Sequence, residues 1–312
     1  MTIEKDRQPQ SIVTILGMHR SGTSLITHMM HASGLDIASD LMMADAHNPE
    51  GYWESIRLNQ ILEDRLTELN SRWHDWRASG TPPTGDHFGR RLKSYLLSEF
   101  SDSQSFVVKD PRLCLFVPDW KSVISDLGIT QRYIIILRDP KDVCVSLARR
   151  DGMPIDKASL LWMRHVKDAE LNTRGCPRLF FLFDEVVFSP SKCVQTVRDT
   201  WPDVVINDEN ISLAALLVRG ELNRSSGETL GQGQFSWATQ LYDIFSNTSE
   251  EFDTSADIDE LYSEFEHWSG RFAPLIEALE EKSRELHNNV LHLTSELNKA
   301  KWLLGDSILS RM

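Results

Sequence analysis

The chain has 312 residues, of which 41% are hydrophobic and 25% charged, a composition typical of a globular protein with a large core. Its net charge of −13 excludes a general binder of nucleic acids or anionic membranes, since both ligands require a positive field. No apolar run approaches the roughly 20 residues of a membrane span, and the polar start MTIEKDRQPQ is unlike a signal peptide, so we expect a cytoplasmic protein without a transmembrane segment.

Apolar runs that predict β-strands alternate with helical patterns along most of the chain. Each run is apolar throughout, which is typical of strands in a parallel sheet that is covered on both faces. We therefore expect an α/β fold over residues 1–235, a three-layer, P-loop-like parallel sheet flanked by helices. The predicted strands lie at 12–16, 105–109, 132–137 and 178–183, and the predicted helices at 22–33, 55–70, 139–150 and 156–174.

The segment 72–90, RWHDWRASGTPPTGDHFGR, has no periodicity and is rich in Pro, Gly and aromatic residues. It predicts a surface loop, and a long loop over a sheet edge often shapes an acceptor site. A purely connecting loop is the alternative.

The last part of the chain has a different character. We expect residues 236–312 to form a separate helical region, because after Gly270 apolar side chains recur at spacings of three, four or seven in a charged run. The pattern predicts a long C-terminal helix that begins at Pro274 and carries a short coiled-coil seam, whose phase slips near Leu286. Two interpretations stay open: the seam joins copies into a homo-oligomer, or it packs on the chain's own domain. The seam residues are Leu275, Leu279, Leu286, Val290, Leu293, Leu297, Ala300 and Leu304.

The stretch VTILGMHRSGTS combines a strand, a glycine loop and the start of a helix. Backbone N–H groups of such a loop converge on an anion, and the helix dipole adds about half a positive charge. A nucleoside triphosphatase would carry Lys after the second glycine, where this chain has Thr23. Arg20 can supply a cation from within the loop, and Ser21, Thr23 and Ser24 can donate hydroxyl groups. A purely structural turn is the alternative.

A second signal is LRDPKDVCVSLARR, from Leu137 to Arg150. Arg138 follows an apolar strand, and Ser146 lies about two turns into the next helix. An arginine at a strand end beside a helix start can grip a phosphate through two hydrogen bonds, and Ser146 could reach the same phosphate. The alternative is an exposed arginine in a salt bridge.

Together, GMHRSGTS and LRDPKDVCVS resemble the two nucleotide-binding signatures of sulfotransferases that use 3′-phosphoadenosine 5′-phosphosulfate (PAPS). The segments NPEGYWE, VVKDPRLCLFVP and LARRDG resemble a bacterial, carbohydrate-type branch, and the likeness covers roughly residues 11 to 190. The resemblance implies transfer of a sulfuryl group to a hydroxyl of a carbohydrate or glycolipid, with 3′-phosphoadenosine 5′-phosphate as the product and without a metal. It assigns the 5′-phosphosulfate to Arg20, Ser21, Gly22, Thr23 and Ser24, and the 3′-phosphate to Arg138 and Ser146.

Catalysis by this chemistry needs groups that stabilise the charge on the leaving phosphate and a base for the acceptor hydroxyl. Arg20, Thr23 and Lys109 are our candidates for the first role. By resemblance, Glu50 in NPEGYWE is our candidate for the base. Glu54, Asp110 and His47 remain alternatives. The family usually has Lys in the loop where this chain has Arg20, and an arginine can bind the leaving oxygen but hardly deprotonates.

Two other hypotheses compete with a sulfotransferase. The first is a P-loop small-molecule kinase, in which Asp110 would act as the magnesium carboxylate. The second is a non-catalytic assembly protein that keeps the nucleotide fold and acts through its C-terminal helix. In addition, Arg219 and Arg224 weakly match a late basic loop over the nucleotide, and Trp162 and His165 are candidates for contact with the acceptor.

Overall fold

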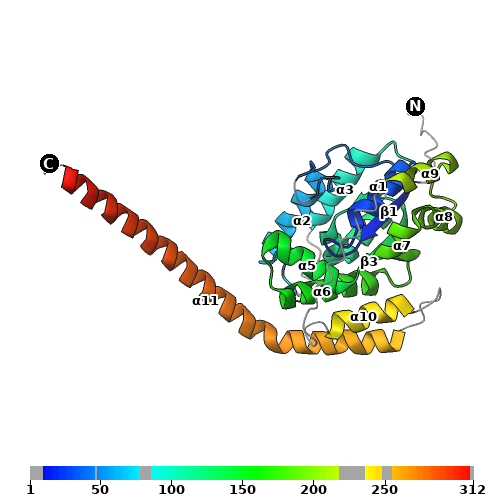
Figure 1. The fold of residues 1–312 in the computed structure, drawn as a ribbon. Coiled ribbons are helices and arrows are strands. Elements are labelled where there is room, and N and C mark those ends of the chain that lie inside the picture. Colours follow the sequence, from blue (N-terminus) through cyan, green and yellow to red (C-terminus); the bar gives the residue numbers. More distant parts are fainter. Residues whose placement is uncertain (1–9, 46–47, 78–85, 218–235, 248–254, 310–312) are drawn as a thin grey trace. The chain divides into compact units, whose positions relative to one another are not determined.

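The structure, a computed structural model, describes residues 10–45, 48–77, 86–217, 236–247 and 255–309. The chain contains a sheet of four parallel strands in the order β2-β1-β3-β4, of which Figure 1 labels β1 and β3. The four predicted strands are confirmed, as β1 (Ser11–Leu16), β2 (Ser105–Lys109), β3 (Thr130–Leu137) and β4 (Arg178–Leu182).

Helices connect the strands and cover both faces of the sheet. In chain order the helical elements, including the 3₁₀ helix η1, are α1 (Thr23–Ala32), α2 (Ile56–Glu68), α3 (Asp86–Phe100), η1 (Pro111–Phe116), α4 (Val117–Asp126), α5 (Pro140–Asp151), α6 (Ile155–Thr173), α7 (Phe183–Phe188), α8 (Pro190–Thr200), α9 (Asp208–Leu216), α10 (Ser236–Asn247) and α11 (Ser255–Leu309).

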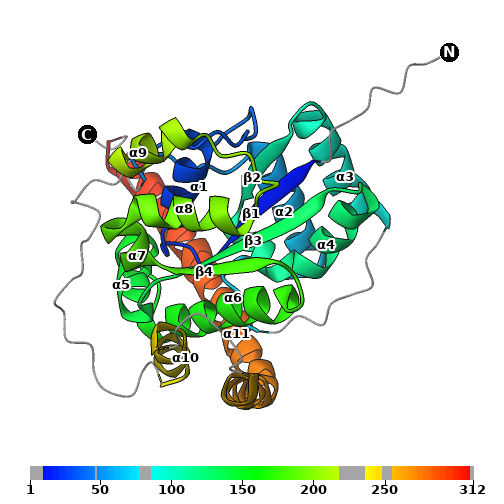
Figure 2. The ribbon, with the colours of Figure 1, turned by 90° about the vertical axis from the view of Figure 1, so that its right-hand side faces the viewer.

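The sheet is buried on both sides, as its apolar strands require. On one face, Val13, Ile15 and Ile134 pack in a core cluster with side chains of α1, α7, α8 and α9. Thr14 points to the other face, where the indole of Trp120 in α4 donates a hydrogen bond of 2.9 Å to its hydroxyl. Figure 2 shows α8 and α4 on opposite sides of the sheet. The predicted three-layer α/β architecture is therefore confirmed.

The strand order places both sequence signatures at one point of the sheet. The chain passes from β1 outward to β2 and then back across β1 to β3. In parallel sheets, ligands bind outside the carboxyl ends of the strands where the order reverses, here between β1 and β3. The glycine loop follows β1 and Arg138 follows β3, so the fold brings together two segments that lie more than a hundred residues apart.

Two predicted boundaries differ from the structure. Helix α11 begins at Ser255 and contains Pro274 in its interior, whereas the sequence suggested a start at Pro274. Buried side chains at helical spacing, Ile258, Leu261 and Tyr262, extend the helix upstream, and their packing outweighs the cost of the interior proline, which removes one helical hydrogen bond. In the segment 72–90, residues 78–85 lie outside the described residues, and the last five residues belong to α3.

The chain divides into two compact units, Met1–Tyr262 and Ser263–Met312, later than the boundary after residue 235 that the sequence favoured. Helix α10 belongs to the first unit because its aromatic side chains pack there. Tyr242 contacts Trp162 of α6 edge to face, with ring centroids 6.5 Å apart, and Phe245 stacks on Phe180 of β4 at 5.1 Å.

Gly17 and Gly22 allow the glycine loop to pack tightly against the sheet. Both have positive φ angles, 150° and 94°. A Cβ atom at Gly17 would lie 2.7 Å from the carbonyl oxygen of Ile136, and one at Gly22 would lie 2.4 Å from the ring of Phe183. A side chain at Gly17 would require a shift of the β3 backbone, and one at Gly22 would require a shift of the Phe183 ring.

We expect Gly22→Ala to lower the free energy of unfolding by roughly 3 kcal/mol, because a left-handed backbone and an overpacked contact combine. Gly128→Ala is the matched control: Gly128 also has a positive φ, 69°, but a Cβ there would meet nothing within 4 Å. Backbone strain alone should cost this control about 1 to 2 kcal/mol. Denaturant unfolding measures both, and equal losses would contradict the packing role of Gly22.

Candidate functional site

The loop after β1 offers backbone donors to an anion. Helix α1 begins after Gly22, its first turn contains no acidic residue, and no side chain in the described part of the protein caps it. The N–H groups of this first turn therefore carry the positive end of the helix dipole without an internal partner. The hydroxyl of Ser21 is buried and has no hydrogen-bond partner among the described residues. Thr23 is buried at the start of the helix, and Ser24 follows it, partly exposed.

Arg20 joins this loop to the second signature. Its backbone is left-handed, with φ 69°, and its side-chain Nε donates a hydrogen bond of 2.9 Å to the hydroxyl of Ser146 in α5. In return, a terminal nitrogen of Arg138 donates to the carbonyl oxygen of Arg20 at 3.2 Å. The three residues that the sequence predicted for opposite ends of one nucleotide are thus in direct contact.

Positive charge is concentrated at this junction. The pKa of Arg20 is lowered, first by burial and then by the nearby cations Arg150 and Arg138. Asp142 and Asp151 each pair with one of these two neighbours, at 3.3 and 2.7 Å. Three arginines, Arg20, Arg138 and Arg150, thus lie close together with two carboxylates beside them, and an incoming anion with several charges would stabilise this arrangement.

Arg138 is held in place from both sides. Its guanidinium lies over the ring of Phe183, 4.4 Å from the centroid, and its Nε is buried without a partner among the described residues. The indole of Trp162 donates to the carbonyl oxygen of Arg138 at 3.1 Å. Trp162 is fully buried, so it supports the strand end and does not form a surface for an acceptor. An arginine fixed in this way is preorganised for a phosphate.

Lys109, at the end of β2, lies in a buried ion pair. Its Nζ is 2.6 Å from a carboxylate oxygen of Glu54, 2.8 Å from the carbonyl oxygen of Tyr52 and 3.2 Å from the hydroxyl of Ser24. Lys109 and Glu54 are both almost fully buried. Burial raises the pKa of Glu54, although the attraction of Lys109 opposes this. Through Ser24, the pair is connected to the glycine loop.

A strained turn directs Glu54 inward. Trp53 has a left-handed backbone with φ 58°, which is rare for a residue other than glycine. Its ring stacks on His28 of α1 at 4.0 Å, and its indole donates to the carbonyl oxygen of Glu50 at 2.9 Å. Glu50 itself is exposed, next to His28. The role of Glu50 as base stays a prediction, and Glu54 is the carboxylate that lies beside Lys109.

Among the described residues, the remaining candidates from the sequence do not add a group to this site. Asp110 is fully buried and pairs with Arg112 at 2.9 Å, which makes it part of an internal charge network. Within the described ranges, no group of three or more His, Cys, Asp or Glu side chains could hold a metal ion. His47, Arg219 and Arg224 lie outside the described residues.

Aromatic side chains cover the loop on one side, which sequence reasoning missed. The ring of His19 lies 4.6 Å from that of Trp73, and the guanidinium of Arg150 also lies over this indole, 5.6 Å from its centroid. Arg164 of α6 fixes the segment by donating to the carbonyl oxygen of Asp75 at 3.1 Å. The beginning of the predicted acceptor loop is therefore attached to the glycine loop and α6. No spacing in the sequence indicates this contact, because it depends on the path of an irregular segment.

Behind His19 lies a second histidine, His165, whose ring is fully buried with its Nε2 unpaired among the described residues. Burial lowers its pKa to about 4. A histidine that is neutral when folded and protonated when unfolded destabilises the fold as the pH falls below 6.5.

We expect His165 to cause a loss of unfolding free energy of roughly 3 kcal/mol between pH 6.5 and 4, since the unfolded chain binds the extra proton in this window. His165→Phe should reduce the pH slope in this window by about that amount. His87→Gln, at an exposed position of α3, is the control and should keep the wild-type slope. Urea unfolding at several pH values measures the slope, and identical slopes for all three proteins would contradict the prediction.

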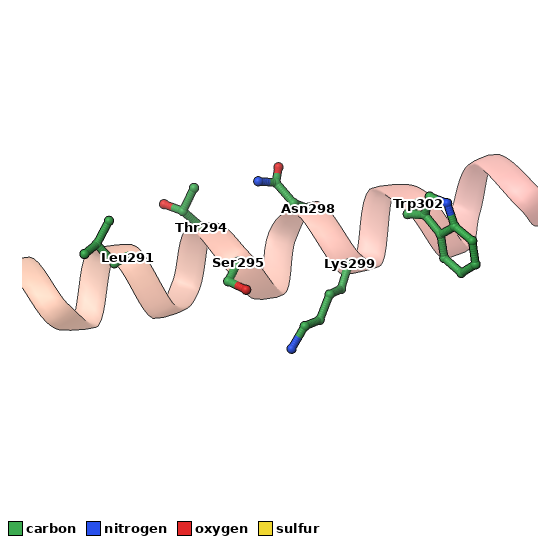
Figure 3. A pocket seen from close by; sticks show the side chains of 6 residues that line it. All are labelled: Leu291, Thr294, Ser295, Asn298, Lys299 and Trp302. Atoms are coloured by element: carbon green, nitrogen blue, oxygen red, sulfur yellow. The ribbon is translucent and has the colours of Figure 1, made fainter.

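A separate surface hollow lies on α11, within the second unit. Figure 3 shows its lining residues, which all come from the one helix. A single helix provides no enclosing wall, and ligand sites are normally concave and enclosed by several elements. The lining residues are Leu291, Thr294, Ser295, Asn298, Lys299 and Trp302.

No protein-family model and no curated protein matches the chain. Three solved structures to which the chain is similar are sulfotransferases. The sulfotransferase domain of the Synechococcus PCC 7002 olefin synthase is 15% identical, with a TM-score of 0.44 over 80% of this chain and 100% of that one. Sulfotransferase STF9 from Mycobacterium avium is 14% identical, with a TM-score of 0.43 over 79% of each chain. Mouse sulfotransferase SULT7A1, solved in complex with PAP, is 14% identical, with a TM-score of 0.36 over 86% of this chain and 90% of that one.

In the ranges that the structure describes, no helix combines the length and the apolar character that crossing a bilayer requires.

Proposed function

We propose that this chain transfers a sulfuryl group from PAPS to an acceptor hydroxyl of a carbohydrate or glycolipid. The observation that carries the proposal is the contact between the two signatures: Arg20 donates to Ser146, and Arg138 donates to Arg20. A ligand with anionic groups on the 3′ and 5′ oxygens of one ribose fits a site where a helix N-terminus and two arginines, each following a different strand, converge. The resemblance of the two segments to PAPS-binding signatures supports the same ligand.

The residues fit such a ligand in separate roles. The uncapped first turn of α1, with Ser21, Thr23 and Ser24, would hold the 5′-phosphosulfate, and Arg138 with Ser146 would hold the 3′-phosphate. When bound, PAPS supplies the sulfuryl group and leaves as 3′-phosphoadenosine 5′-phosphate. Arg20 would stabilise the negative charge on the leaving phosphate, as a fixed donor in a partly buried site. Lys109 lies 3.2 Å from Ser24 and would add its charge from the β2 side.

A carboxylate would take the proton of the acceptor. Glu50 is the candidate that the resemblance gives, and we favour Glu54 because it lies 2.6 Å from Lys109, which also contacts Ser24 of the glycine loop. Burial raises the pKa of Glu54 against the attraction of Lys109, which is the direction that suits a general base. Its partner Lys109, 2.6 Å away, would hold the carboxylate in position.

A kinase would need a different set of groups. It requires a cation directly after Gly22, where the chain has Thr23. The carboxylate of Asp110, which the kinase hypothesis needs for magnesium, pairs with Arg112. Magnesium-dependent ATP hydrolysis by the pure protein would favour a kinase over our proposal.

We expect the wild-type chain to bind 3′-phosphoadenosine 5′-phosphate without magnesium, and Arg138→Ala to weaken this binding by about 10- to 100-fold. The loss corresponds to one or two charge-assisted hydrogen bonds. Isothermal titration calorimetry in a magnesium-free buffer measures the affinity.

Arg132→Ala is the matched control for this variant. Arg132 lies near the other end of the same strand, β3, and pairs with Asp203 at 2.9 Å. It should bind the nucleotide as the wild type does. Equal affinities of wild type and Arg138→Ala, with intact folds by circular dichroism, would refute the proposed 3′-phosphate site.

We expect Glu54→Gln to lower the rate of sulfuryl transfer by about 100- to 10,000-fold, the usual contribution of a general base. Transfer from labelled PAPS to a panel of glycans and glycolipids measures the rate. Glu50→Gln should reduce it less than about tenfold, since an exposed carboxylate outside the ion pair would not take the proton. The opposite ranking would identify Glu50 as the base, and no loss in either variant would exclude both.

Glu54→Gln also leaves Lys109 buried without its carboxylate, which destabilises a fold by about 3 to 5 kcal/mol. Nucleotide affinity and thermal unfolding of the variant should therefore be measured beside the rate. Retained nucleotide binding with a lost rate would indicate a chemical role, and loss of both would indicate a structural one.

A further inference from the structure

Helix α11 carries a continuous row of exposed apolar side chains in the second unit of the chain. Leu279, Leu286, Val290, Leu293 and Leu297 are each 54 to 66% exposed. When the row is counted through Ile276 instead of Leu275, the spacing continues past Leu286 without the expected phase slip. Heptad positions a and d then alternate without a break. The a positions are Ile276, Ser283, Val290 and Leu297, and the d positions are Phe272, Leu279, Leu286, Leu293 and Ala300.

The width of this row distinguishes between the two interpretations of the helix, a seam between copies of the chain and packing on the chain's own domain. A helix that packs on a globular core has an apolar stripe covering three or four positions of each heptad. Here the outward positions b, c and f are mostly polar or charged, with Glu277, Arg284, Glu285 and Asn288 among them. A stripe of two positions in seven is typical of a seam between two similar helices.

The residue types at the seam indicate the number and direction of the helices. β-branched residues at a, such as Ile276 and Val290, combined with leucine at d favour a parallel pair. In a parallel pair, each g position meets the e position five residues later on the other helix. Glu296 at g would then face Lys301 at e of the second copy, an attractive contact in both directions. Glu296 also pairs with Lys299 of its own helix at 2.8 Å.

We propose that residues 272–301 form a parallel, in-register two-stranded coiled coil with a second copy of this chain. The two seams would cover each other, and the Glu296–Lys301 contacts would fix the register. This assembly rests on the seam alone and is independent of the proposed sulfuryl transfer.

The oligomeric state of the full-length chain tests the proposal. Light scattering after size exclusion should give a dimer for the wild type, and Leu293→Asp should weaken the dimer on the order of 100-fold or more, because it buries two charges in the seam. Leu291→Asp is the matched control, since Leu291 is 55% exposed on the same helix but lies at position b. It should remain a dimer. A monomeric wild type, or a dimer that survives Leu293→Asp, would overturn the proposal.

A disulfide test checks the direction of the two helices. In a Cys176→Ser background, which removes the one cysteine of the chain that is not buried, Leu293→Cys should form a disulfide-linked dimer on mild oxidation, because equivalent d positions face each other in a parallel pair. Leu291→Cys should not. A dimer that does not cross-link through position 293 would overturn the parallel register.

Discussion

The hydrogen bonds among Arg20, Ser146 and Arg138 join two strand ends that the chain separates by more than a hundred residues. They form only because β1 and β3 are neighbours, and because Gly17 and Gly22 let the loop approach β3 and α7 closely. Like charges are thereby held together at an energetic cost, which the surrounding fold must balance. A site of this kind is more stable with a multiply charged anion than without one.

The buried pair of Lys109 and Glu54 is the second place where the fold keeps charges away from water. Such a pair is weak evidence for stability, since desolvation offsets much of its attraction. Its position is more informative, because Lys109 also contacts Ser24 of the glycine loop. A shift of the glycine loop at Ser24 and a change in the charge of Glu54 are therefore coupled through the ammonium group of Lys109. In the proposed reaction, such coupling would let the loop bind PAPS while Glu54 takes the proton of the acceptor hydroxyl.

The strands could be predicted from the sequence, because continuous apolar runs specify buried parallel strands. The meeting of the two signatures could be predicted as well, because they follow two strands of one parallel sheet, β1 and β3. The inward position of Glu54 could not. It depends on the left-handed backbone of Trp53 and on the stacking of that ring on His28, and neither leaves a pattern in the sequence. The start of α11 was misjudged because proline is common at the first position of a helix, whereas here the apolar spacing before Pro274 prevails.

The conformation of Trp53 has a consequence for how this site can vary. Glycine or asparagine would adopt the same backbone more easily, but neither offers a ring to stack on His28. The residue that best suits the local backbone would therefore loosen the turn that directs Glu54 toward Lys109. At position 53, the residue types that best adopt a left-handed backbone cannot supply the ring that stacks on His28. We therefore expect the segment from Glu50 to Glu54 to accept substitutions only when several of its residues change together.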